Sequence, residues 1–228
     1  MIQAFFDGLA ASGDPARAEH ALGYFPTAMR HLGVTTPRLR ACLQPLVRAQ
    51  RAAPDADVVF ALWSNGIFEA RQAAYQLLES VPRLRRSLSR EAVLALAAGN
   101  DNWCSVDTYG TYLAGPAWRE GVLTDADIAA WSASPDRWLR RTAIVSTIAL
   151  NIKARGGRGD VPRTLAVCAR HVSERDDMVQ KGLSWAVRAC IEHDAEAVAE
   201  FLTEHDAALA GRVKREVRNK LRTGKKNP

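Results

Sequence analysis

The fold of this chain is decided by three short segments: NWCSVD at residues 102–107, RWLRRTAI at residues 137–144 and KGLSWAVR at residues 181–188. They recur roughly every 40 residues, a period typical of helical hairpins that stack into a solenoid. In the first segment, Trp103 and Asp107 are four residues apart. In the third, Lys181, Trp185 and Arg188 keep the same helical rhythm. Residues at this spacing share one face of a helix, so we predict helices that present indoles, one carboxylate and several cations.

Composition supports a helical protein. Alanine and leucine dominate, β-branched residues are comparatively few, and no stretch alternates with period two. This pattern predicts an all-α protein, and the repeat period favours an α-solenoid of HEAT-like repeats with a concave inner face. The 228 residues suit one domain. We predict that domain over residues 1–222 and a disordered basic tail over residues 223–228.

Several residues mark where helices should begin. Asp14 and Thr36 each precede a proline, which places a capping oxygen before a proline at the first helical position. Ser89 and Thr124 precede further helical patterns, and acids follow Thr124 in the first turn. We expect these four residues to cap helices.

The cations are clustered along the chain. The formal net charge is +6, with arginines concentrated at residues 83–90 and 137–141 and a third basic cluster from Arg212 to Lys226. Clustered cations favour a polyanionic partner. Solvated helix faces and a disordered tail would give the same pattern.

The sequence offers no recognisable metal site. Its four cysteines and five histidines form no CxxC pair, no HExxH motif and no other ligand spacing. We therefore expect no metal and no cofactor, and reduced thiols as in cytosolic proteins. No apolar stretch approaches the roughly 20 residues that span a bilayer, so we expect a cytoplasmic protein that does not enter membranes.

One carboxylate beside indoles is chemically sufficient for a particular reaction. Cleavage of an N-glycosidic bond builds positive charge on the sugar, and an adjacent carboxylate stabilises that charge. An alkylated purine is already cationic as a leaving base, so no strong general acid is needed. Aromatic faces attract such a cation by about 1–2 kcal/mol each when desolvated. The same residues would not suffice for a neutral base.

Four motifs, in order, resemble those of the AlkD-type DNA glycosylases, a HEAT-like-repeat family of DNA alkylation repair enzymes. WCSVD at 103–107 resembles the family's W-D-S-V-D, WLRRTAI at 138–144 its W-L-x-R-x-A-I, and KGLSWAVR at 181–188 its K-A-I-G-W-x-L-R. Near the N-terminus, Tyr24 and LGVTTP at 32–37 resemble a tyrosine followed by L-G-I-x-T-P. The resemblance spans nearly the full length and implies that the concave, basic face binds DNA.

The resemblance implies an activity and its catalytic residues. The expected enzyme is a monofunctional alkylpurine DNA glycosylase that releases N3-methyladenine or N7-methylguanine from duplex DNA without base flipping and leaves an abasic site. Asp107 would stabilise the sugar cation and orient the attacking water. Trp103 and Trp185 would contact the deoxyribose.

The resemblance also implies which residues contact the DNA. Arg141 and Arg188 would bind phosphates near the lesion, and Tyr24 would lie close to the opposite side of the duplex. We place Lys181 and Thr35 at the DNA as well. The expected partner is double-stranded DNA containing alkylated purines, bound by a monomer at the nucleoid.

Three residues depart from the family pattern. Cys104 stands where the family often has aspartate, Asn102 where a second tryptophan can occur, and Thr35 where the motif has glutamine. The acid and both indoles remain, so these departures bear on lesion preference.

Each assignment has a structural alternative. Asp107 could be a surface carboxylate, Lys181 an exposed helix charge, and Trp103 and Trp185 core residues like most tryptophans. We assign the remaining tryptophans, Trp63, Trp118, Trp131 and Trp138, to the core, and Arg140 to solvent.

Two other functions remain open. One is a non-catalytic HEAT-like binder of damaged or branched DNA. The other is a protein-interaction scaffold in which the tryptophans anchor an interface. Steep salt dependence of binding would separate both DNA-binding functions from the scaffold, and release of a base would separate the enzyme from the binder.

Overall fold

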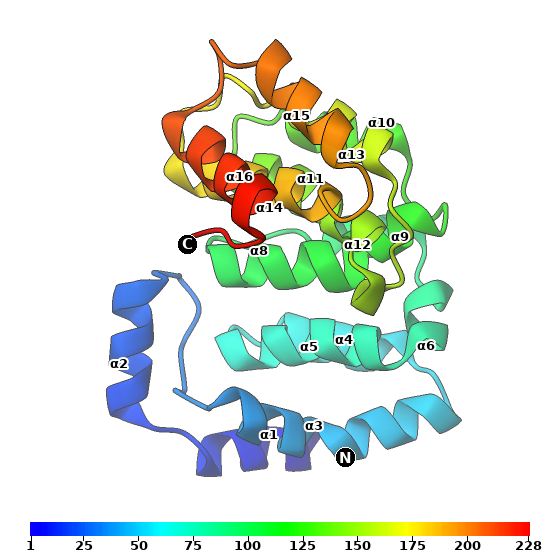
Figure 1. Ribbon diagram of the computed structural model, residues 1–228. Helices are drawn as coiled ribbons and strands as arrows, with labels where there is room; N and C mark the ends of the chain where they lie inside the picture. The colour runs from blue at the N-terminus through cyan, green and yellow to red at the C-terminus, as the bar shows by residue number, and fades with distance from the viewer. The chain divides into compact units, whose positions relative to one another are not determined.

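The computed structural model describes residues 1–228 and is built from helices (Figure 1). It contains sixteen α-helices, one π-helical turn and one 3₁₀ turn, and its only β pairing is an isolated bridge between Arg30 and Ile67. The predicted all-α class is confirmed. The helices form two compact units, Met1–Leu113 and Ala114–Pro228.

The first unit contains eight α-helices: α1 (Ile2–Ala11), α2 (Pro15–Tyr24), α3 (Thr36–Ala52), α4 (Ala56–Trp63), α5 (Phe68–Ser80), α6 (Pro82–Ser87), α7 (Arg90–Ala95) and α8 (Trp103–Tyr109). The π-helical turn η1 (Gly110–Ala114) follows α8. Within this unit α3 packs on α5 and α5 packs on α8, while α4 covers α5. Helix α5 therefore forms the centre of the first unit.

The second unit contains the remaining helices: α9 (Gly115–Arg119), α10 (Asp125–Ser132), α11 (Arg137–Ser146), α12 (Ile148–Asn151), η2 (Lys153–Arg155), α13 (Val161–Ala169), α14 (Asp177–Cys190), α15 (Ala195–Glu204) and α16 (Gly211–Thr223). The successive pairs α10–α11 and α13–α14 pack together. In turn, α11 packs on α14, and α14 packs on α16. Helix α14 is the centre of the second unit.

The three segments quoted first all lie on helices, as predicted: 102–107 opens α8, 137–144 lies in α11, and 181–188 lies in α14. The caps agree at three of four positions. Asp14, Ser89 and Thr124 each accept a hydrogen bond from a backbone N–H of the following turn. Thr36 was wrongly predicted as a cap, because α3 already begins at Thr36 and its N-cap is Thr35.

The core is apolar and closely packed, as its buried aromatic residues show. Tyr75 and Tyr109 are fully buried in the first unit, and Trp118 is almost so in the second. Each buried tyrosine donates its hydroxyl to a carbonyl oxygen, that of Leu96 for Tyr75 (2.8 Å) and that of Val93 for Tyr109 (2.8 Å). Buried polar atoms that keep a partner avoid the desolvation cost of an unmade hydrogen bond. No helix combines the length and the apolar character that crossing a bilayer requires.

Candidate functional site

The start of α8 is fixed by a hydrogen-bonded cap. Asn102 is the N-cap, and its Oδ1 accepts from the backbone N–H of Ser105 (2.9 Å) while its Nδ2 donates to the Ser105 hydroxyl (3.1 Å). Gln72 of α5 donates to the same hydroxyl (3.1 Å). Trp103, the first residue of α8, is thereby held in register against the centre of the first unit.

Asp107 lies one turn after Trp103 and is half-buried. Cys104 lies between these two residues in the sequence. Burial and, to a lesser extent, the negative charge of Asp107 raise the pKa of its thiol to about 12. The thiol is therefore neutral beside a charged carboxylate. The helix continues as the π turn Gly110–Ala114, and such turns occur frequently at functional sites.

Trp103 is contacted by two aromatic rings in T-shaped geometry. Tyr24, at the end of α2, meets the indole edge-on with 5.6 Å between ring centroids, and Phe25 does so at 5.7 Å. Edge-to-face pairs of this kind add about 0.5–1.5 kcal/mol beyond burial. Tyr24 is nevertheless 69% exposed. The structure thus brings Tyr24 and Trp103 together and leaves the tyrosine open to a ligand.

The segment between α2 and α3 is held by two carboxylates that sequence reasoning did not select. Asp101 accepts from the Thr27 hydroxyl (2.5 Å) and from the backbone N–H of Ala28 (2.7 Å). Glu69, buried in α5, accepts from three consecutive backbone N–H groups, those of residues 32, 33 and 34 (2.8–3.2 Å). Because these bonds join residues 35 to 74 positions apart, local spacing carries no signal for them.

Thr35 occupies the N-cap position of α3, but its side chain makes no capping hydrogen bond. It lines a pocket of about 480 Å³ together with Phe25, His31 and Phe68. Burial lowers the pKa of His31, against the opposing charges of Glu69 and Asp101. Thr35 therefore lies in the same unit as Tyr24 and Trp103.

Helix α14 carries the residues predicted from the third segment. Lys181 forms an ion pair with Asp177 (2.7 Å), which also pairs with Arg212 of α16 (3.1 Å). Trp185 is half-buried. Arg188 donates to the Ser184 hydroxyl (3.2 Å) and lies 4.0 Å from the carboxylate of Glu216. Burial lowers the pKa of Arg188 and Glu216 opposes that shift, and the guanidinium stays charged.

Arg141 of α11 lies beneath α14. Only 4% of the residue is exposed, and its guanidinium donates to the carbonyl oxygen of Met178. A Cβ added to Gly182 would lie 3.5 Å from both Cγ and Nη1 of Arg141. These are ordinary van der Waals distances, so Arg141 packs directly against the α14 backbone at Gly182.

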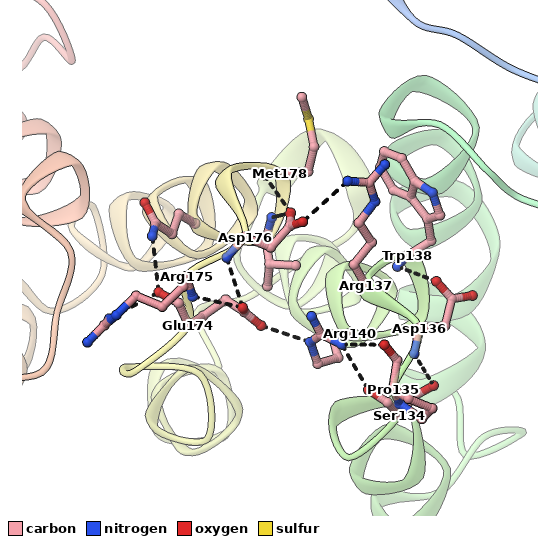
Figure 2. Close-up of polar contacts among 12 residues, drawn as sticks. Ser134, Pro135, Asp136, Arg137, Trp138, Arg140, Glu174, Arg175, Asp176 and Met178 are labelled. Atoms are coloured by element: carbon pink, nitrogen blue, oxygen red, sulfur yellow. Dashed lines mark hydrogen bonds and ion pairs between the residues drawn. The ribbon is translucent and has the colours of Figure 1, made fainter.

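Figure 2 shows that the other charges of the second segment are structural. Arg140, predicted to be solvated, instead pairs with Glu174 (2.8 Å) and donates to the carbonyl oxygens of Ser134 and Pro135 (Figure 2). This prediction was wrong because the partner carboxylate, Glu174, lies 34 positions away in the sequence, and only folding brings it to Arg140. Arg137 pairs with Asp176 (3.3 Å) and covers the ring of Trp138 at 4.8 Å.

The remaining tryptophans divide into two groups. Trp118 and Trp131 are 2% and 7% exposed, which confirms their assignment to the core. Trp63 and Trp138 are only half-buried, and each ring is covered by an arginine, Arg71 and Arg137 respectively. The assignment of these two tryptophans to the core was therefore wrong in part, because a guanidinium and not an apolar side chain covers one face of each ring.

The predicted site residues therefore form two groups, each within its own unit. Tyr24, Thr35, Trp103 and Asp107 belong to the first unit, and Arg141, Lys181, Trp185 and Arg188 to the second. The first group offers a carboxylate, an indole and an exposed phenol. The second offers an indole and three cations.

Comparison with known proteins identifies the family. Among solved structures the chain is similar to a predicted DNA alkylation repair enzyme from Enterococcus faecalis, with 19% sequence identity, a TM-score of 0.72, and coverage of 90% of this chain and 95% of that chain. At this identity the likeness shows the fold. No curated protein matches the chain. The family model for DNA alkylation repair enzymes matches residues 7–221, and the protein therefore belongs to the DNA alkylation repair enzyme family, of the AlkC/AlkD type.

Proposed function

We propose that this protein is a monofunctional DNA glycosylase that hydrolyses the N-glycosidic bond of cationic alkylpurines in duplex DNA and leaves an abasic site. The observation that carries the proposal is the turn from Trp103 to Asp107, where a half-buried carboxylate lies one helical turn from an indole that contacts the exposed Tyr24. An oxocarbenium-like sugar is stabilised by such a carboxylate. Family membership supports an alkylated DNA substrate.

The proposal gives each residue of the first unit a role. Asp107 stabilises the developing sugar cation and orients the attacking water, Trp103 contacts the deoxyribose, and Tyr24 and Thr35 contact the duplex. An N3-methyladenine or N7-methylguanine base is cationic while attached to the sugar and takes the electron pair of the glycosidic bond as it departs. It therefore leaves as a neutral molecule, and no general acid has to protonate it. The Cys104 thiol, whose pKa is about 12, is too weak an acid to protonate the base, which agrees with a reaction that needs no general acid.

The second unit is proposed to supply the phosphate contacts and the other indole. Arg141, Arg188 and Lys181 neutralise phosphates, and Trp185 contacts deoxyribose. In this proposal the helix pairs are HEAT-like repeats with a concave, basic, DNA-binding face, and the base is released without being flipped into a pocket.

Release of 7-methylguanine from methylated duplex DNA tests the proposal. We expect wild-type protein to release the base and Asp107→Asn to reduce the single-turnover rate at least 100-fold, about 2.7 kcal/mol of transition-state stabilisation, while duplex affinity is retained. The amide keeps the shape of the carboxylate, so the variant should fold. Wild-type protein that binds duplex but releases nothing over long incubation would leave the non-catalytic DNA binder as the function.

Arg141→Ala separates a phosphate contact from a structural arginine. If Arg141 neutralises one phosphate, the slope of log affinity against log salt should fall by about one unit. Since the side chain is 4% exposed, its thermal stability must be measured in parallel. An unchanged slope with a lower melting temperature would assign Arg141 to the packing of α11 on α14.

A further inference from the structure

The basic C-terminal helix α16 has no role in the proposed function so far, although it is firmly attached to α14 (Figure 1). Glu216, 3% exposed, accepts from the Ser184 hydroxyl (2.5 Å). The same carboxylate lies 3.7 Å from Arg212 and 3.3 Å from Lys226. Burial acts to raise the pKa of Glu216, but the bonds from Ser184 and Lys226 outweigh it and hold the pKa below its usual value. Helix α16 is thus fixed by a buried, charged carboxylate.

One turn beyond Glu216, Lys220 reaches a pocket of about 360 Å³ that Trp185 and Arg188 also line. Lys153 of η2 lines the pocket from another side, and Glu192 is its only carboxylate. Arg188 also lies 4.0 Å from the Glu216 carboxylate, so the two lysines against Glu192 leave an excess of at least one positive charge. A pocket of this size matches the small-ligand range of roughly 300–1,000 Å³.

The two lysines are available to a ligand. Lys220 donates one N–H to the carbonyl oxygen of Gly224 (2.8 Å), which holds the ammonium over the last turn of α16. A lysine ammonium has three N–H donors, so two remain. Neither lysine has a carboxylate partner. By contrast, Lys214 and Arg218 of the same helix both pair with Asp206 (3.2 and 2.7 Å).

We propose that this pocket binds one phosphodiester of a DNA strand, with Lys153 and Lys220 as its cationic contacts and the Trp185 ring against the adjoining sugar. An anion is favoured by the excess charge, and a nucleotide unit is favoured over a bare ion because the indole supplies a flat apolar wall. This inference rests on the proposed function for its ligand. It makes α16 a part of the DNA-binding surface.

Binding of undamaged duplex at several salt concentrations tests the inference with Lys220→Gln, Lys153→Gln and the double variant. Each lost phosphate contact should reduce the salt slope by about 0.9, equivalent to about eightfold weaker affinity at 0.1 M salt. The double variant should lose about twice that slope. Arg215→Gln is the matched control, because Arg215 lies exposed on the same helix, outside the pocket, and carries the same charge. Its slope should stay at the wild-type value.

Two outcomes would overturn the inference: salt slopes unchanged in the lysine variants, or a loss of slope no larger than that of Arg215→Gln. Because the duplex is undamaged, failure of base release by wild-type protein would reject the glycosylase alone. The lysine result would then still decide the phosphodiester site.

Discussion

Asp101→Asn tests how Trp103 is held, because the Asp101 carboxylate joins the segment after α2 to the start of α8 by hydrogen bonds. Its Oδ1 accepts from Thr27 Oγ1 (2.5 Å) and Asn102 Nδ2 (3.1 Å), and its Oδ2 accepts from the Ala28 N–H (2.7 Å). The segment so anchored carries Tyr24 and Phe25, the two rings that contact Trp103. Loosening it should therefore loosen the indole.

The magnitude follows from these three bonds. In asparagine one oxygen becomes an NH₂ group. Turning the remaining oxygen toward Ala28 keeps the backbone bond, and the NH₂ can donate to the Thr27 hydroxyl, but it then faces the Asn102 Nδ2 donor. Hydrogen bonds to charged groups contribute roughly 1.5–3 kcal/mol, so for this half-buried position we expect a loss of about 1.5 kcal/mol. In a chain of this length that corresponds to a fall in melting temperature of about 3–6 °C.

Thermal unfolding and single-turnover base release measure the effect. Release should slow about tenfold, while affinity for undamaged duplex stays near the wild-type value because no phosphate contact is removed. Thr27→Val, which deletes one of the three donors, should have a smaller effect on both. An Asp101→Asn protein with wild-type melting temperature and wild-type release would refute the claim that this carboxylate positions Trp103.

The stability that Asp101 contributes should also depend on pH. Burial acts to raise the pKa of Asp101, but the bonds from Thr27, Ala28 and Asn102 outweigh it and hold the pKa below the usual 3.8. A carboxyl whose pKa is lowered on folding contributes stability above its unfolded pKa and loses it as the pH falls through the folded pKa. The stability difference between wild type and Asp101→Asn should therefore be full at neutral pH and shrink below about pH 4.

Three further predictions concern backbone strain at Gly33, burial of His171 and burial of Cys104. Gly33→Ala should destabilise by more than about 3 kcal/mol, because φ is +75° and the added Cβ would lie 2.1 Å from the carbonyl oxygen of Asp14; Gly66→Ala, with φ +79° and open space, should cost only about 1 kcal/mol in urea unfolding. Burial lowers the pKa of His171 to about 4, against the charge of Glu174. Stability should therefore fall as the pH drops from about 6.5 toward 4, by at most about 1.4 kcal/mol per pH unit, and His171→Gln should flatten this slope. Cys104, with a pKa of about 12, should resist iodoacetamide at pH 8 in native protein and react after unfolding; rapid labelling of the native thiol by mass spectrometry would contradict its burial.

The helices were predictable because their signals are local. Asn102, Asp136 and Asp176 each cap the helix that carries one of the three quoted segments, and all three accept from backbone N–H groups two or three residues ahead. A cap and the apolar spacing behind it lie within one short stretch of sequence. The all-α class and the helical state of the three segments therefore follow from local chemistry.

The supports of the candidate site were not predictable in the same way. Glu69, Asp101 and Glu216 are ordinary charged residues in the sequence, and their importance comes from partners that only folding brings near. The same is true of Arg140, whose pairing with Glu174 turned an expected surface charge into a link between α11 and the start of α14. Spacing rules describe one helix at a time, so contacts between helices fall outside them.

Cys104 shows what a single departure from the family pattern does to the electrostatics. An aspartate at 104 would place a second carboxylate one helical turn from Asp107, and like charges at that range raise each other's pKa and compete for one proton. The thiol here stays neutral, because burial and Asp107 raise its pKa to about 12. Asp107 therefore faces the proposed lesion without a negative neighbour at 104. Under the proposed mechanism, Cys104 attracts the cationic base before cleavage less than an aspartate at that position would. The stabilisation of the sugar cation by Asp107 during cleavage is unchanged. The residue at 104 should therefore affect lesion affinity, and Asp107 the chemical step.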